Sequence, residues 1–87
     1  MDDQKTMKIK VKFFAIARDL AATGDADVDL PGNTSAGDAL ARVVEVFPKL
    51  NKIQARLALA VNQSYARRDH ILADGDELAL IPPVSGG

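Results

Sequence analysis

The chain has 87 residues, enough for one small domain with a modest hydrophobic core. Eleven basic and twelve acidic side chains give a formal net charge of −1, which argues against a nucleic-acid binder that relies on a basic surface. The sequence has no cysteine, which excludes a disulfide framework, a thiol nucleophile and the commonest zinc ligands, and is compatible with a cytoplasmic protein.

Three parts can be distinguished along the chain. Residues 1–6 are polar and lack the apolar segment of a signal peptide, so we expect a flexible leader before a domain that spans residues 7–81. No apolar run approaches the ~20 residues that a membrane helix needs. Residues 82–87 are expected to follow the domain as an extended tail that ends in Gly-Gly.

Alternating residue types predict a first strand over residues 8–16. One side of this strand is apolar and faces the core, and it carries Ile9, Val11, Phe13 and Ala15. Lysines begin the other side, where Phe14 and Ile16 add apolar bulk. Either a neighbouring loop covers Phe14 or a partner protein does.

A short helical turn and a second strand are predicted next. The turn covers residues 18–22 and ends at residues 23–25. Ala26, Val28 and Leu30 then alternate with acidic residues until Pro31-Gly32 closes the strand. Two strands joined by a loop of this length indicate an antiparallel pair.

The clearest helix follows Asn33, Thr34 and Ser35, whose side-chain oxygens are good N-caps. Asp38 in the first turn suits the partial positive charge of the exposed N–H groups. Residues at three- and four-residue spacing form one apolar stripe: Ala36, Ala39, Leu40, Val43, Val44 and Phe47. Pro48 is expected to end the helix.

A strand and a short return are predicted beyond a weakly patterned connection over residues 49–56. Leu57, Leu59 and Val61 alternate with alanines, a turn occupies residues 62–64, and residues 65–67 form the returning strand.

The last part of the domain comprises a compact crossover over residues 69–72, a tight turn and a final strand. We expect Ile71 and Leu72 to point inward, and Gly75 to take the positive φ that the turn requires. The final strand covers residues 77–81, with Leu78 and Leu80 on the core side.

This order of elements predicts an α+β fold. One amphipathic helix packs across one face of a mixed sheet of about five strands, which buries its apolar stripe economically. A right-handed crossover would place the first and last strands near the centre. The pattern is that of a β-grasp, the ubiquitin-like fold.

The tail has the residues of a presented chemical group. Pro82 and Pro83 stiffen the exit from the last strand, because proline fixes φ near about −65° and donates no hydrogen bond. Gly86 and Gly87 carry no Cβ, so this end can thread a narrow channel and present its carboxyl group to another protein's reactive centre. A frayed terminus is the alternative, but the well-patterned strand that runs into the tail favours presentation.

Three apolar residues have no clear place in the core, namely Phe14, Tyr65 and Ile81. A patch formed by them near the tail would be a docking surface. His70, the only histidine, is interpreted as a loop or packing residue rather than a catalyst. The cations Arg18, Arg67 and Arg68 are interpreted as solvated surface charges that could also guide partners.

Residues 75–87, Gly-Asp-Glu-Leu-Ala-Leu-Ile-Pro-Pro-Val-Ser-Gly-Gly, resemble the C-terminus of the MoaD family, the ubiquitin-like sulfur carriers that form the small subunit of molybdopterin synthase. Further matches are residues 11–15 followed by Arg18, then Ala39-Leu40 and Val61-Asn62-Gln63. Together they cover nearly the whole chain from residue 7 to residue 87.

The resemblance implies a mechanism at Gly87. An activating enzyme of the MoeB type uses ATP to adenylate the Gly87 carboxylate, and sulfur from a donor such as a cysteine desulfurase or rhodanese replaces the adenylate as a thiocarboxylate. The tail then enters a large subunit of the MoaE type, where sulfur passes to a pyranopterin precursor. The small subunit would bind no stable cofactor or metal and would supply no catalytic group of its own.

The resemblance also implies which residues meet the partners in a heterotetrameric synthase. Phe14, Tyr65 and Ile81 fit the docking face by position, and the tail residues that accompany Gly86 and Gly87 into the partner are Pro82, Pro83, Val84 and Ser85. Three alternatives stay open. They are a sulfur carrier for thiamine synthesis or tRNA thiolation, a ubiquitin-like modifier conjugated to lysines, and a plain interaction module with an inert tail.

Overall fold

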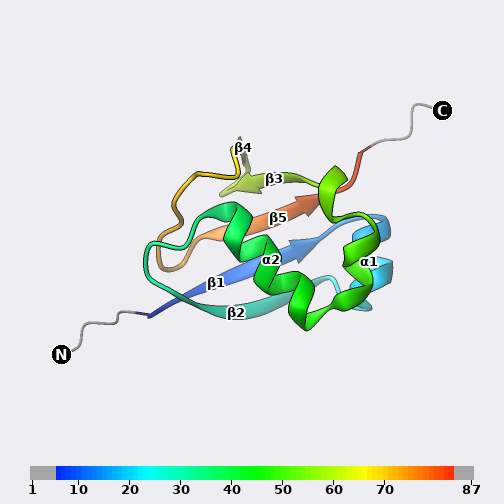
Figure 1. Cartoon of the computed structure of the whole chain (residues 1–87), viewed down its shortest axis with the longest axis horizontal. Coiled ribbons are helices and arrows are strands. Elements are labelled where there is room, and N and C mark those ends of the chain that lie inside the picture. The colour runs from blue at the N-terminus through cyan, green and yellow to red at the C-terminus, as the bar shows by residue number, and fades with distance from the viewer. Residues whose placement is uncertain (1–5, 84–87) are drawn as a thin grey trace.

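The computed structural model describes residues 6–83, which form one mixed sheet and one main helix (Figure 1). The strands are β1 (Thr6–Phe13), β2 (Asp25–Pro31), β3 (Ala58–Val61), β4 (Ser64–Ala66) and β5 (Glu77–Ile81). Their order across the sheet is β2-β1-β5-β3-β4, with β1 parallel to β5 and the other neighbours antiparallel. The predicted α+β fold and the central position of the first and last strands are therefore confirmed.

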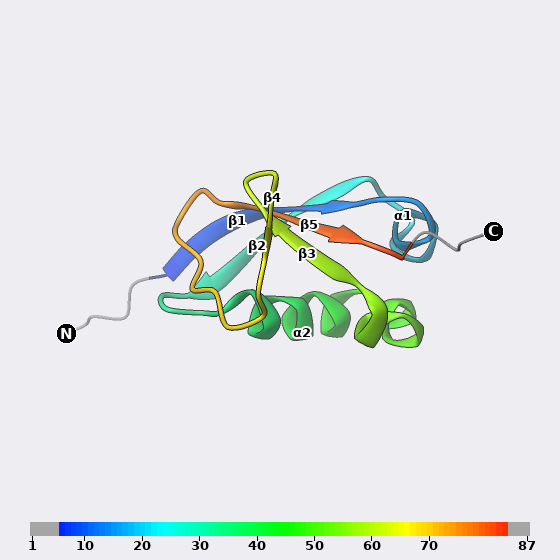
Figure 2. The same ribbon diagram turned by 90° about the horizontal axis from the view of Figure 1, so that it is seen from above.

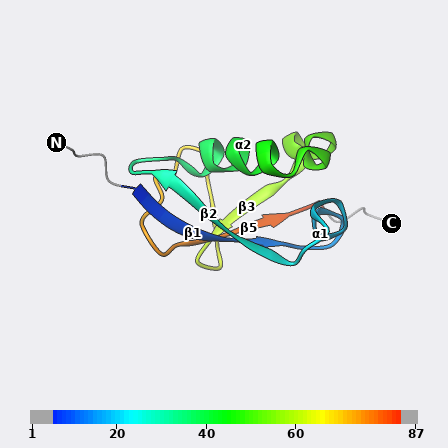
Figure 3. The ribbon, with the colours of Figure 1, turned by 90° about the horizontal axis from the view of Figure 1, so that it is seen from below.

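The helices lie on one side and at one end of this sheet. The main helix is α2 (Ala36–Val46), and the shorter elements are α1 (Ile16–Ala21), η1 (Pro48–Lys52) and η2 (Gln54–Arg56). Views from above and from below show α2 across one face of the sheet (Figure 2 and Figure 3). Within residues 6–83, no helix is long and apolar enough to span a membrane.

The first strand is shorter at its end than the alternation of residue types predicted. Ile9, Val11 and Phe13 are buried as expected, but the strand ends at Phe13. Ala15 is exposed rather than part of the core face, and its backbone has φ 52° and ψ −129°. The chain turns here because the Ala17 N–H bonds the Phe14 carbonyl at 3.0 Å and begins α1. At its other end the strand includes Thr6, one residue before the predicted domain boundary.

The α2 helix begins and ends where its caps predict. Ser35 is the N-cap, and its hydroxyl accepts a 3.1 Å hydrogen bond from the Asp38 N–H. The buried stripe consists of Ala36, Ala39, Leu40 and Val43. At the C-terminal end the Phe47 ring packs edge-to-face on Phe13, with ring centroids 5.1 Å apart.

Backbone groups of the crossover between β4 and β5 satisfy the N-terminus of α2. The Ala36 N–H bonds the His70 carbonyl at 2.7 Å, and the Gly37 N–H bonds the Arg68 carbonyl at 2.8 Å. The prediction for Ile71 is wrong, because this side chain is 53% exposed while Leu72 is buried. Ile71 forms an isolated bridge to Ser35, and in such extended backbone successive side chains point to opposite sides.

Candidate functional site

The final strand delivers the chain to the edge of the domain from the middle of the sheet. β5 lies between β1 and β3, and its bounds are those predicted. Leu78 and Leu80 are fully buried, and Ile81 is half-buried on the other side of the strand. Pro82 is buried, and Pro83 is exposed and ends the described part of the chain. The predicted contact residues Val84 and Ser85 and the predicted reactive residues Gly86 and Gly87 lie outside the described residues.

The strand register brings Tyr65 and Ile81 onto the face of the sheet opposite α2. Tyr65 pairs with Ala60 on β3, and Ala60 pairs in turn with Ala79 on β5. Ile81 follows two residues after Ala79 and pairs with Ala58. Because side chains alternate along a strand, these five residues share one face.

Phe14 reaches the same face from the end of β1. It directly follows Phe13, whose partner on β5 is Leu80, just as Ile81 directly follows Leu80. Phe14 and Ile81 therefore lie side by side at the ends of two adjacent parallel strands. The Phe14 side chain is 46% exposed and Tyr65 is 77% exposed, so no loop within residues 6–83 covers Phe14.

We call this surface the outer apolar face, defined by Phe14, Ala58, Ala60, Tyr65, Ala79 and Ile81. Alanines form its middle, where Ala60 and Ala79 are buried, and larger apolar side chains lie at its margins, so a partner that docks here removes a continuous apolar surface from water. The sequence analysis did not assign the alanines to the docking surface. The sequence did contain a signal for them. Alanines alternate with core residues over residues 57–61, and Ala79 alternates with Leu78 and Leu80, so small side chains lie on the side opposite the core in two neighbouring strands.

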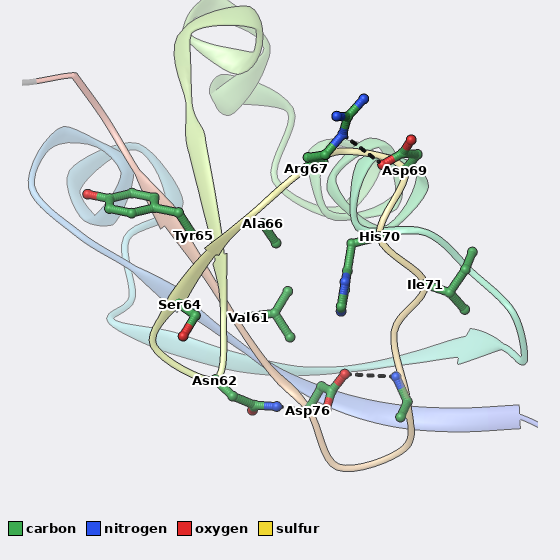
Figure 4. Close-up of a pocket in the computed structure, with 11 residues that line it drawn as sticks. Val61, Asn62, Ser64, Tyr65, Ala66, Arg67, Asp69, His70, Ile71 and Asp76 are labelled. Carbon is green, nitrogen blue, oxygen red and sulfur yellow. Dashed lines mark hydrogen bonds and ion pairs between the residues drawn. The ribbon is translucent and has the colours of Figure 1, made fainter.

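A separate open groove of about 600 Å³ lies at the opposite end of β5, between the β3–β4 hairpin and the crossover (Figure 4). Asp76, which precedes β5, lines it together with His70 and Arg67. Arg67 and Asp69 form a 3.4 Å ion pair on its rim, with both side chains mostly exposed, so the pair contributes little stability. Since β5 carries the tail from its other end, this groove is not part of the tail outlet.

Two of the residues considered as possible functional groups have structural roles. The His70 carbonyl caps α2 through Ala36, as described above. The Arg68 guanidinium donates to the carbonyls of Gln54 at 3.2 Å and Leu57 at 3.1 Å, so it ties the crossover to the end of η2. The interpretation of Arg68 as a simple solvated charge is therefore incomplete. Within residues 6–83, no cluster of His, Asp or Glu side chains could hold a metal ion.

Comparison with known proteins identifies the family of this chain. The model of the ThiS family matches residues 11–87. The molybdopterin synthase sulfur carrier subunit of Drosophila ananassae is 44% identical over 88 residues, which cover 98% of this chain and 97% of that protein. The protein of the same name from Arabidopsis thaliana is 37% identical over 86 residues, which cover 99% of this chain and 90% of the relative.

Solved structures agree on the fold. SAMP1 from Haloferax volcanii superposes with a TM-score of 0.84 at 33% identity, covering 92% of this chain and 99% of that chain. A chain in the complex of subunits 1 and 2 of the molybdopterin-converting factor from Helicobacter pylori 26695 gives a TM-score of 0.65 at 23% identity, covering 93% of this chain and 100% of that chain. The second likeness shows the fold alone.

Proposed function

The chain belongs to the ThiS family, and on that premise we propose that it is the sulfur carrier subunit of molybdopterin synthase in molybdenum cofactor biosynthesis. One observation carries the assignment. Relatives of that name are 37% and 44% identical to this chain over nearly its whole length. The β-grasp fold and the tail sequence support the same reading.

The reactive group is the carboxylate of Gly87. A free carboxylate is a poor acyl donor, so an activating enzyme of the MoeB type uses ATP to convert it to an acyl-adenylate. The outer sulfur of a persulfide on a cysteine desulfurase or rhodanese then attacks the acyl carbon and displaces AMP, which gives an acyl disulfide. A thiol of a partner protein or a small-molecule thiol reduces that S–S bond, which leaves the thiocarboxylate on Gly87 and returns the donor cysteine. Dividing one difficult substitution into two easier ones is the usual advantage of such an intermediate. The chain itself holds no stable cofactor in this scheme.

Delivery of the thiocarboxylate depends on the position of the outlet. Pro82 packs against the domain and Pro83 leaves it, which supports a stiff exit beside the outer apolar face. A partner that docks on Phe14, Tyr65 and Ile81 would receive the tail directly in its active site, with Val84, Ser85 and Gly86 in its channel.

The large subunit of the synthase is the first such partner. The relatives bear the name of one subunit of an enzyme, and the Helicobacter pylori structure is a complex of subunits 1 and 2. These names support a larger subunit as the partner of this chain, and we propose that the two assemble as a heterotetramer with two copies of each. The activating enzyme binds the same face before sulfur is loaded, and both binding events take place in the cytoplasm.

Intact-mass measurement after co-expression with the activating enzyme and a sulfur donor tests this function. The expected product has one carboxylate oxygen of Gly87 replaced by sulfur. That product should then convert a pyranopterin precursor when the large subunit is added. An unmodified chain, or a thiocarboxylate that serves only thiamine synthesis or tRNA thiolation, would contradict the assignment.

A ubiquitin-like protein modifier is the second candidate. It is favoured by the similarity to a Haloferax volcanii protein whose solved structures are titled SAMP1 and small archaeal modifier protein 1, at 33% and 30% identity. The same mass measurement separates the two functions, because a modifier forms conjugates linked to lysines of other proteins.

A further inference from the structure

Strand β2 is the free edge of the sheet on the side away from the tail-bearing strand. It pairs only with β1, and within residues 6–83 no other strand lies beside it (Figure 1). An edge strand of this kind exposes backbone donors and acceptors that can pair with a further strand.

The hydrogen-bond phase of the β1–β2 pair identifies the outward-facing groups. The Phe13 N–H bonds the Gly24 carbonyl at 3.0 Å. In an antiparallel ladder, hydrogen-bonded and non-hydrogen-bonded pairs alternate, so Ala26 and Val28 bond to β1. Asp25, Asp27 and Asp29 belong to the non-hydrogen-bonded pairs. Their N–H and C=O groups therefore point away from β1, into the space beyond the edge. The Asp25 carbonyl already accepts a 2.9 Å hydrogen bond from the Thr23 hydroxyl, so the groups open to a further strand are those of Asp27 and Asp29.

A groove of about 330 Å³ lies directly beside this edge, between β2 and α2. Its apolar lining comes from Ala26 and Val28 on the strand and from Val46 and Phe47 at the end of the helix. Arg42 of α2 also lines the groove, and its guanidinium is paired with Glu45 at 3.3 Å, so the groove itself takes the apolar side chains of an added strand and not its cations. Val46 is 54% exposed, although it belongs to the helix that covers the core. An added strand would place every second side chain over this groove and the remaining ones over the outer side of the sheet.

The charges along the edge decide which strand fits. Asp25, Asp27 and Asp29 are exposed at two-residue spacing on the outer side. A second copy of β2 would place aspartate directly opposite aspartate, which is destabilising. Strand β1 shows the complementary pattern, since Lys8, Lys10 and Lys12 lie opposite these aspartates and the Lys10 Nζ is 3.8 Å from Asp27 Oδ1.

We propose that the β2 edge and its groove bind an extended segment of another protein in which lysine or arginine alternates with apolar residues. The backbone of that segment pairs with Asp27 and Asp29, and its cations lie over the carboxylates of Asp25, Asp27 and Asp29. Its apolar side chains enter the groove beside Val46. This mode is β-strand addition, in which the backbone provides affinity and alternate side chains provide specificity. The site is separated by the width of β1 from the residues that β3, β4 and β5 contribute to the outer apolar face.

The test uses the 87-residue protein labelled with ¹⁵N and the synthetic peptide acetyl-Lys-Val-Lys-Val-Lys-Val-Lys-amide. We expect saturable amide shifts at Asp25, Asp27, Asp29 and Val46, and weaker binding at high salt. The matched peptide with glutamate in place of each lysine should not bind. No saturable shifts, equal binding of both peptides, or shifts centred on Phe14 and Ile81 would overturn the proposal.

Two variants locate the site. Val46→Lys places a cation at the groove and should weaken binding of the basic peptide by about tenfold or more. The loss of one apolar contact can account for a change of this size. Ile71→Lys is the matched control, because Ile71 is 53% exposed but lies on the crossover. Equal affinities of the two variants would contradict the proposal.

Asp27→Pro is an independent variant that removes an outward N–H and the exposed ion pair with Lys10, while every backbone hydrogen bond between β1 and β2 is kept. It should abolish the shifts at the edge while leaving the rest of the spectrum folded, and retained binding would refute pairing at this strand. Sedimentation of the protein without peptide should show a monomer. A dimer that Asp27→Pro dissociates would instead identify a second copy as the occupant.

Discussion

The Asn62 side-chain amide donates a 2.9 Å hydrogen bond to Oδ1 of Asp76, and its carbonyl oxygen accepts a 3.0 Å bond from the Glu77 N–H. These contacts join the β3–β4 turn to the start of β5, fifteen residues away from Asn62. Asp76 also accepts a 2.8 Å bond from the Ala73 N–H through Oδ2. The strand that carries the tail is therefore anchored at the end opposite to its outlet.

Removing this link is expected to destabilise the fold. Asn62→Gly keeps a residue that tolerates the observed φ of 51° but loses both side-chain bonds, at a cost of about 1–2 kcal/mol in the free energy of unfolding. Urea denaturation measures this change in the free energy of unfolding. Gln63→Gly is the matched control, because Gln63 also has a positive φ, 74°, and its side chain makes no hydrogen bond within residues 6–83. Equal effects of both substitutions would argue against the link.

Gly37→Ala should lower stability although alanine is the better helix former. A Cβ on Gly37 would lie 3.1 Å from both Cβ and the carbonyl oxygen of Arg68, and that carbonyl accepts the Gly37 N–H. To admit the methyl group the crossover must shift by a few tenths of an ångström, which lengthens this 2.8 Å bond, so we expect a loss of about 1 kcal/mol. Gly24→Ala is the control, since its Cβ would meet only the Arg18 side chain, at 3.6 Å. Thermal denaturation that ranks Gly24→Ala as the worse variant would contradict the close approach.

Ala15→Gly should stabilise the protein. Ala15 has φ 52° and ψ −129°, a conformation that is costly for a residue with a Cβ and open to glycine. We expect a gain of about 1 kcal/mol in the free energy of unfolding. The same substitution at Ala41, inside α2, should instead cost about 1 kcal/mol. A loss of stability at both positions would show that the turn at Ala15 is not strained.

The outer apolar face is expected to determine binding of the large subunit. Ile81→Asp or Phe14→Asp places a charge where a partner removes water, and either should weaken the complex by about tenfold or more while the domain stays folded. Ile71→Asp is the control, because that exposed side chain lies on the crossover. Calorimetric titration with the large subunit gives the affinities. Wild-type affinity in both face variants would exclude this surface.

Gly87→Ala should block sulfur transfer at the end of the tail. An added methyl group crowds the acyl carbon and the channel that must admit it. Domain stability should be unchanged, whereas mass measurement should detect loss of the thiocarboxylate or the activity assay should detect loss of transfer. Unimpaired transfer by this variant would remove the main support for a presented Gly87 carboxylate.

Local patterns were sufficient to predict most elements of the fold. The Ser35 cap, the apolar stripe and Pro48 bound α2, and alternation of residue types identified β2 and the bounds of β5. These signals are readable because each arises from neighbours along the chain, whose spacing repeats with the period of a helix or strand. The function was predicted from the tail in the same way, because the order of residues 75–87 is distinctive by itself and does not depend on contacts with the rest of the domain.

Contacts between distant segments were decided only by the tertiary structure. Ile71 lies outside because its bridge to Ser35 sets which way the crossover faces, and Ala15 leaves the sheet because α1 begins there. The register of β1, β5, β3 and β4 collects Phe14, Tyr65 and Ile81 on one face, and the sheet order leaves β2 free. No local period encodes which strand lies beside which, because that choice depends on burying the stripe of α2 against the whole sheet.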